Sequence, residues 1–191
     1  MTTDSQLRNR MRDVPGFVGV FQADRLPEIF EPGQTLIANC DNAGMPGSHW
    51  IAMARRHDGQ PIFFCAYGLG PDKQDPFLPI AHKTYFRNYL ARFGKISYNN
   101  DDFEGLRADT CGEWACLFIL CLHQLVPSRW TIDAIETVHP NVKNMTTTER
   151  DAAVVDLVGI RQSNDIPEQL SARRRGHART ASLPIGLHAV H

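Results

Sequence analysis

The stretch from Asp109 to Leu125 constrains the fold of this chain more than any other. It opens with polar residues, passes through a Cys-Gly pair, and is then apolar on nearly every face, with no Pro or Gly from residue 113 to 125. Asp109 or Thr110 can cap the first turn of a helix. A helix that is apolar all round belongs in the middle of a domain, so a buried central helix is expected here.

Cys111 falls in the first turn of that helix. Free backbone N–H groups and the helix dipole favour a thiolate at such a position and are expected to lower the cysteine pKa. Gly112 would let a ligand approach the backbone, and its N–H could face a developing oxyanion. Cys116 and Cys121 lie within the apolar run and are expected to be small core residues. The same plain core role for Cys111 stays open as the alternative.

The bulk composition fits one globular domain. The chain has 191 residues, of which 42% are hydrophobic and 21% are charged, with a net charge of -1. That charge gives no overall basic field for nucleic acid. The first residues show no secretory leader, and no apolar run is long enough to span a membrane. Five cysteines in such a chain indicate free thiols in a reducing compartment.

The pattern before and after the central helix predicts an α+β fold. An Asp-Gly turn at residues 58–59 separates strand-like residues 48–55 from 61–67, which predicts a hairpin that places His49 and Cys65 near the same end of adjacent strands. Further strands are expected at residues 35–40 and 95–98 and an apolar core segment at 17–21, with helices at 5–12, 80–93, 131–138 and 148–160. We therefore expect a central, mostly antiparallel sheet packed on the buried helix that carries the cysteine. Residues 1–162 would form one domain and residues 163–191 a basic, mobile tail.

His49 is the best candidate for a base that would activate Cys111. It opens an apolar strand after a Gly-Ser loop, so its ring can face a cleft. No metal site is expected, because Cys111 and Cys116 do not have the close spacing of a structural zinc knuckle. The chain also lacks a nucleotide-binding glycine motif and a Cys-x-x-Cys pair, so no cofactor is expected.

Four short motifs resemble the adenovirus maturation protease (adenain) family, whose more distant relatives are the SUMO/Ulp deconjugases. They are residues 47–52 around His49-Trp50, residues 63–68, Glu104-Gly105 and the segment Thr110-Cys111-Gly112, and the resemblance covers roughly residues 15–130. It implies a papain-like α+β fold in which the histidine precedes the cysteine. It also implies a viral thiol endopeptidase that cleaves virion precursor polypeptides, with Cys111 as nucleophile and His49 as base. Such a protein would act in the virion and in the nucleus or cytoplasm of the host cell, and would not be secreted.

Two positions depart from the family's motif. Cys65 stands where the family has the acid that orients the histidine, and a neutral thiol is a weak acceptor. Glu104 stands where the family has the glutamine that donates to the oxyanion, and a carboxyl can donate only when protonated. Asn99, Asn100 or Asp101 could replace either group if their loop folds back. Three readings stay open: a Cys–His dyad protease, an impaired protease fold that serves as a virion structural or interaction component, and an unrelated thiol hydrolase or deconjugase.

The resemblance also implies activation by DNA and by a disulfide-linked peptide. Residues 95–102 contain no cysteine, which argues against a disulfide-linked peptide. DNA binding would rest on Arg55-Arg56 and on the basic run of Arg173, Arg174 and Arg175 in the tail. A solvated tail is the alternative for that run. If the tail binds DNA, its affinity should fall steeply with salt.

Overall fold

The computed structural model describes residues 2–72, 83–100, 102–105, 109–123, 144–162 and 187–190. In chain order the elements are α1 (Asp4–Met11), β1 (Phe17–Gln22), β2 (Thr35–Asn39), β3 (Trp50–Arg55), β4 (Pro61–Phe64), α2 (Lys83–Ala91), β5 (Ile96–Asn99), α3 (Cys111–Leu122), α5 (Thr147–Gln162) and β6 (Leu187–Val190).

The strands form one six-stranded sheet in the order β1-β2-β3-β4-β5-β6. The pairs β1–β2 and β4–β5 are parallel, and the other three pairs are antiparallel. The predicted α+β class is confirmed, but the sheet is mixed. Parallel neighbours need long connections, which a local sequence pattern does not reveal.

Successive residues of β3 and β4 belong alternately to two apolar cores, one on each face of the sheet. On one face, Trp50, Ala52 and Ala54 pack with the residues of α1, α3 and α5. On the other face, Ile51 and Met53 pack with residues of α2. Each strand is therefore buried on both sides, which explains why β2, β3 and β4 are almost continuously apolar.

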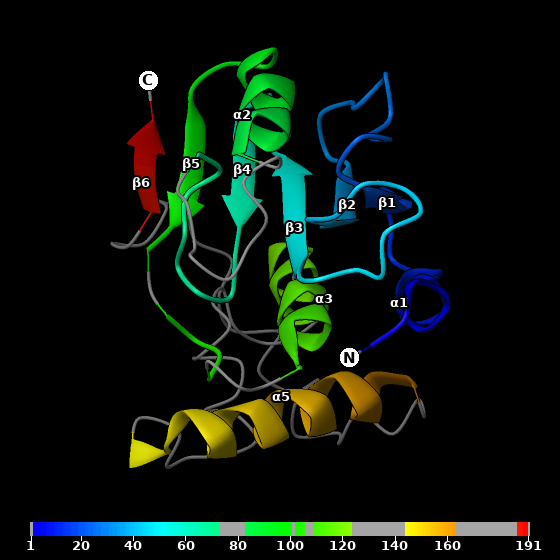
Figure 1. Ribbon diagram of the computed structural model, residues 1–191, viewed down its shortest axis with the longest axis vertical. Helices are drawn as coiled ribbons and strands as arrows, with labels where there is room; N and C mark the ends of the chain where they lie inside the picture. Colours follow the sequence, from blue (N-terminus) through cyan, green and yellow to red (C-terminus); the bar gives the residue numbers. More distant parts are fainter. Residues whose placement is uncertain are drawn as a thin grey trace, which may run out of the picture.

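Helix α3 is the buried central helix that the sequence predicts. Every residue from Cys111 to Cys121 is buried. Its sides contact β3, α1 and α5, and α5 lies across the lower end of α3 in Figure 1. Because neighbours surround this helix, its sequence needs no polar face.

The predicted hairpin is present, with shorter strands than expected. Gly59 sits in the turn with a φ of 87°, a conformation that favours glycine. Strand β3 begins at Trp50 and β4 ends at Phe64. His49 and Cys65 therefore lie just outside the ladder, where their side chains can serve a site without interrupting the strand pairing.

The end of the chain differs in part from the expected mobile tail. Within residues 163–191, Leu187–Val190 forms β6 and pairs with β5 at the edge of the sheet. The helix expected at residues 131–138 and the basic run Arg173–Arg175 lie outside the described residues. Among the described helices, none is long and apolar enough to cross a membrane.

Candidate active site

The candidate active site lies where α3 begins, beside the start of β3 and the end of β4. The backbone N–H of Trp50 donates to Sγ of Cys111 over 3.4 Å. Trp50 follows His49 directly in the chain, so this bond fixes the start of β3 against the start of α3. The structure thus brings the predicted nucleophile and the predicted base together.

His49 is held on two sides. Its Nε2 lies 3.4 Å from Sγ of Cys65, and its ring stacks on Tyr67 with centroids 4.7 Å apart. Burial lowers the pKa of His49 to about 4. The imidazole is therefore neutral at pH 7 and can accept a proton, and the neighbouring Cys65 thiol is a weak partner for the charged ring.

Cys111 does not have the lowered pKa that its position at a helix start predicts. Burial, with a contribution from nearby Glu104, raises the pKa of the Cys111 thiol to about 12. The backbone N–H groups of Trp50 and Gly112 pull it down, but less strongly. Desolvation outweighs the helix dipole here because the side chain is only 2% exposed. The resting pair is a thiol and a neutral imidazole.

Gly112 does not leave open space for a ligand, in contrast to what the sequence suggests. A Cβ at this position would lie 3.1 Å from Cδ2 of Leu7 and 3.3 Å from both Cβ of Thr2 and Cδ1 of Trp50. Glycine therefore permits the close packing of the N-terminal segment against α3, and a larger residue would push these neighbours away by a few tenths of an ångström.

Glu104 lies at the start of α3, at the place expected for the oxyanion donor. Its Oε1 accepts from the backbone N–H of Thr110, the N-cap residue of α3, over 2.9 Å. The side chain of Thr110 makes no capping hydrogen bond, so the Glu104 carboxyl supplies one instead. Its Oε2 is buried and has no hydrogen-bond partner among the described residues. Burial, and next the nearby Asp151, raise the pKa of Glu104 to about 8. Much of this carboxyl is therefore protonated at neutral pH and able to donate.

Asp151 is a site residue that the sequence did not reveal. Its Oδ1 accepts from Nε1 of Trp114 and lies 2.9 Å from Oγ1 of Thr110, and its Oδ2 accepts from the N–H of Gly105. One carboxylate on α5 therefore ties the Glu104-Gly105 segment to the first turns of α3. In the sequence it is one of several polar residues of an amphipathic helix, and no local signal marks it.

Asn99 does not supply the missing acid for His49. Its Oδ1 accepts from the N–H of Cys65 over 3.0 Å, and its Nδ2 donates to the Cys65 carbonyl over 2.7 Å. The amide is committed to fixing the backbone of Cys65, and through it the position of the thiol beside His49. Asp101 lies outside the described residues.

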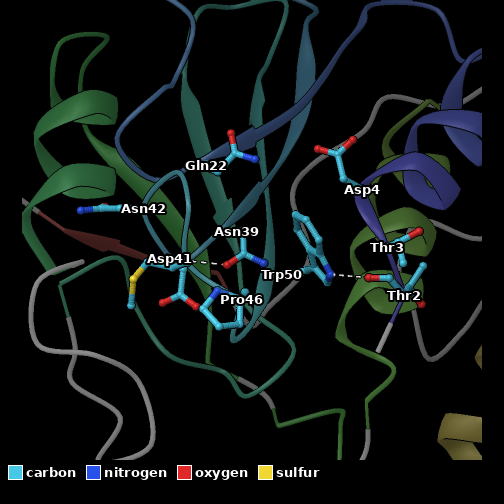
Figure 2. Close-up of a pocket in the computed structure, with 11 residues that line it drawn as sticks. Thr2, Thr3, Asp4, Gln22, Asn39, Asp41, Asn42, Pro46 and Trp50 are labelled. Atoms are coloured by element: carbon cyan, nitrogen blue, oxygen red, sulfur yellow. Dashed lines mark hydrogen bonds between the residues drawn. The ribbon is translucent and has the colours of Figure 1, made fainter.

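A pocket of about 260 Å³ adjoins this site (Figure 2). Trp50 forms one wall, and its Nε1 donates to the carbonyl of Thr2 over 2.9 Å. Asn39, Asp41 and Pro46 line the side away from the N-terminal segment. Through Trp50, the pocket reaches the residue that directly follows His49 in the chain.

Three candidate metal ligands also meet here, although the sequence predicts no metal site. One donor atom each from His49, Glu104 and Cys111 lies within 4.8 Å of the other two, and all three side chains are buried. These residues come from three separate segments, so the spacing of cysteines along the chain could not indicate the cluster.

No known protein-family profile matches this chain. It is similar to a protein of Acanthamoeba polyphaga mimivirus whose name describes it as a putative thiol protease. The two are 29% identical over 90 residues, which is 44% of this chain and 28% of the relative. This chain therefore spans less than a third of the viral protein it resembles, and over that part it is similar to a viral protein named as a cysteine protease.

Proposed function

We propose that this chain is a viral-type cysteine endopeptidase that works through a Cys111–His49 dyad. The observation that carries the proposal is the meeting of a thiol at the first residue of a buried helix with an imidazole and a carboxyl, each contributing an atom within 4.8 Å of the others. The similarity to a viral protein named as a thiol protease supports the same reaction class.

The dyad would act by proton transfer at the moment of attack. Nε2 of His49 lies beside Cys65, so we assign to Nδ1 the role of taking the proton from Cys111. The sulfur then attacks the scissile carbonyl carbon, and His49 returns the proton to the leaving amine. Water releases the acyl group from Cys111 in the second half of the reaction. A neutral resting pair makes substrate binding a condition for activation.

Glu104 would supply the hydrogen bond that the oxyanion needs. Its buried Oε2 is free of other partners among the described residues, and a protonated carboxyl there can donate to developing negative charge. This role would replace the amide donor of the adenain family, which this chain resembles in its motifs.

Labelling with a peptide vinyl sulfone tests the proposal. We expect covalent labelling confined to Cys111, lost in Cys111→Ser and slowed by about 10³-fold or more in His49→Ala. A matched variant, Cys121→Ala, removes a thiol from the far end of the same helix and should label as the parent does. Equal labelling of Cys111 with and without His49 would contradict the dyad.

An impaired protease fold that serves as a virion structural or interaction component is the second candidate. Two observations favour it. His49 and Cys111 are only 1% and 2% exposed, so a substrate cannot reach them without movement of the chain, and the group beside His49 is the weak acceptor Cys65. In that case the probe would leave Cys111 unlabelled while the chain still bound virion proteins.

We further propose the substrates, the activators and the place of action of this protease. Virion precursor polypeptides would be the substrates, and the virion with the host nucleus or cytoplasm the place of action. DNA and a non-covalently bound peptide would be the activators. Deleting residues 171–179, which include Arg173–Arg175, should weaken DNA binding and flatten its salt dependence. Unchanged affinity and slope would remove DNA from the proposal.

A further inference from the structure

The cluster of His49, Glu104 and Cys111 has the donor types of a zinc site. It offers one thiol sulfur, one imidazole nitrogen and one carboxylate oxygen, the three ligand types that Zn²⁺ takes most often. The side chains are 1%, 1% and 2% exposed, respectively. Burying three such donors together costs free energy unless each finds a partner, because each must lose its hydration.

A second observation concerns the carboxyl group of this cluster. Oε2 of Glu104 is buried with no hydrogen-bond partner among the described residues, while Oε1 is held by Thr110. An unpartnered buried carboxyl oxygen costs free energy, because the atom loses its hydrogen bonds to water and gains none in return. A cation beside this oxygen would remove that cost.

The surroundings hold at least two of the three donors in fixed orientations. Cys65 and Tyr67 contact the ring of His49 on two sides. Thr110 holds Glu104, and Asp151 in turn holds Thr110. Such outer contacts orient the ligands of natural metal sites.

We infer that His49, Glu104 and Cys111 form a binding site for a divalent transition-metal ion of the zinc type, with one position left open for water. Ligand atoms around tetrahedral zinc lie about 3.5 Å apart, given bonds of about 2.0–2.3 Å. The observed limit of 4.8 Å therefore requires side-chain movements of about 1 Å. On binding, the thiol releases its proton to solvent, a protonated Glu104 does the same, and neutral His49 donates a lone pair.

A bound ion would take both members of the dyad out of reaction. The sulfur of Cys111 would be coordinated, and the nitrogen of His49 that should accept its proton would be occupied. Metal binding would then inhibit the enzyme reversibly. This consequence rests on the proposed protease function, whereas the binding itself does not.

Cobalt titration of the reduced, chelator-treated full chain tests the site. Co²⁺ bound to a thiolate gives a charge-transfer band in the near ultraviolet, and tetrahedral Co²⁺ gives intense visible bands. We expect both to saturate at one Co²⁺ per chain, over hours because the donors are buried, and to disappear when Zn²⁺ is added. Cys111→Ser should abolish the charge-transfer band. The near-isosteric Glu104→Gln removes a direct ligand and should weaken binding by at least the roughly 10–100-fold that loss of an outer-shell partner costs.

Two further variants, Cys121→Ala and Cys65→Ser, test whether Cys111 is the thiol that binds the metal. Cys121→Ala should keep the full spectrum, because ten residues of helix place it about 15 Å along α3 from Cys111. A band that survives Cys111→Ser, or one lost in Cys65→Ser but unchanged in Glu104→Gln, would overturn the assignment. Absence of any cobalt–thiolate band in the parent chain would also overturn it. Cobalt binding by a chain that no peptide vinyl sulfone labels would refute the protease proposal alone.

Discussion

The two ends of α3 carry the same residue type in very different surroundings. Cys111 at the first residue and Cys121 near the last are both buried, with exposures of 2% and 4%. Around Cys111 stand an imidazole and a carboxyl, and two backbone N–H groups face its sulfur. Cys121 belongs to the apolar core formed by α3, α5 and the sheet. Burial alone therefore does not distinguish the proposed nucleophile from a packing residue; the neighbouring polar groups do.

The first turn and the middle of α3 also differ in the interactions that hold them in place. At the first turn, Glu113 pairs with Arg10 and accepts from Oγ1 of Thr2 over 2.6 Å, so the N-terminal segment is tied to the site. The middle of the helix is held by apolar contacts, including Phe118 stacked on Phe64 at 4.5 Å. Directional bonds set the geometry of the site end, and non-directional packing stabilises the rest.

The largest expected contrast between the two ends is catalytic. Cys111→Ala should remove peptide hydrolysis, by about 10⁴-fold or more, because the nucleophile is lost. Cys121→Ala should leave kcat/KM unchanged and lower the free energy of unfolding by about 1 kcal/mol, since it leaves a small cavity. Peptide turnover and urea denaturation of both variants measure this. A similar loss of activity in both would mean that the ends do not differ functionally.

The next effect concerns Glu104 and pH, measured with a chelator present. As pH rises through about 8, Glu104 ionises and loses the proton it would donate to the oxyanion. A lost oxyanion donor costs about 10²–10³ in rate. Glu104→Gln keeps a donor at every pH, so the ratio of its kcat/KM to that of the parent should rise from pH 7 to pH 9. A ratio that stays constant would remove Glu104 from this role.

The ionisation of Glu104 should also lower the stability of the folded protein as pH rises. The pKa of Glu104 is raised from 4.5 to about 8, so its contribution is fully present below pH 4.5 and is lost as pH rises through about 8. We expect the free energy of unfolding of the parent to fall across that window by a few kcal/mol more than that of Glu104→Gln. Urea denaturation of the two proteins at pH 5 and pH 9 measures the difference.

A smaller gain is expected from restoring an acid beside His49. Cys65→Asp would place a carboxylate near Nε2, which Cys65 now approaches to 3.4 Å. It should stabilise the imidazolium and raise kcat by about 10-fold or more, given that an orienting acid is worth up to about 10⁴. Cys65→Ser, a neutral change of similar size, should give no gain. Equal rates for the two variants would mean that orientation of His49 does not limit turnover.

The smallest expected effect is at Asp151, which acts through other residues. Asp151→Asn replaces an acceptor of several hydrogen bonds by an amide, at a cost of about 1–3 kcal/mol in stability. It should also lower kcat modestly, with KM little changed, because Glu104 and Thr110 would shift. The control Asp156→Asn changes an exposed residue of the same helix. Thermal unfolding and steady-state kinetics compare the stability and kcat of the two variants. Equal effects of Asp151→Asn and Asp156→Asn would show that Asp151 has no positioning role.

Local pattern was enough to predict the central parts of this protein. The all-round apolar run predicts a buried α3, and the Asp-Gly turn predicts the hairpin that brings His49 and Cys65 to one end of adjacent strands. These features follow from residue periodicity and turn chemistry, which act over a few residues. The position of Cys111 at the first residue of its helix follows from the same pattern.

Only the tertiary structure decided the chemistry of the site. The meeting of Glu104 and Asp151 at the start of α3 depends on packing between distant segments, as do the parallel pairings of the sheet. The sequence predicts a lowered pKa for Cys111, but the pKa is raised, because desolvation outweighs the helix dipole. Periodicity encodes which residues are buried, but the free energy of a charge depends on everything that surrounds it, and that is set when the chain has folded.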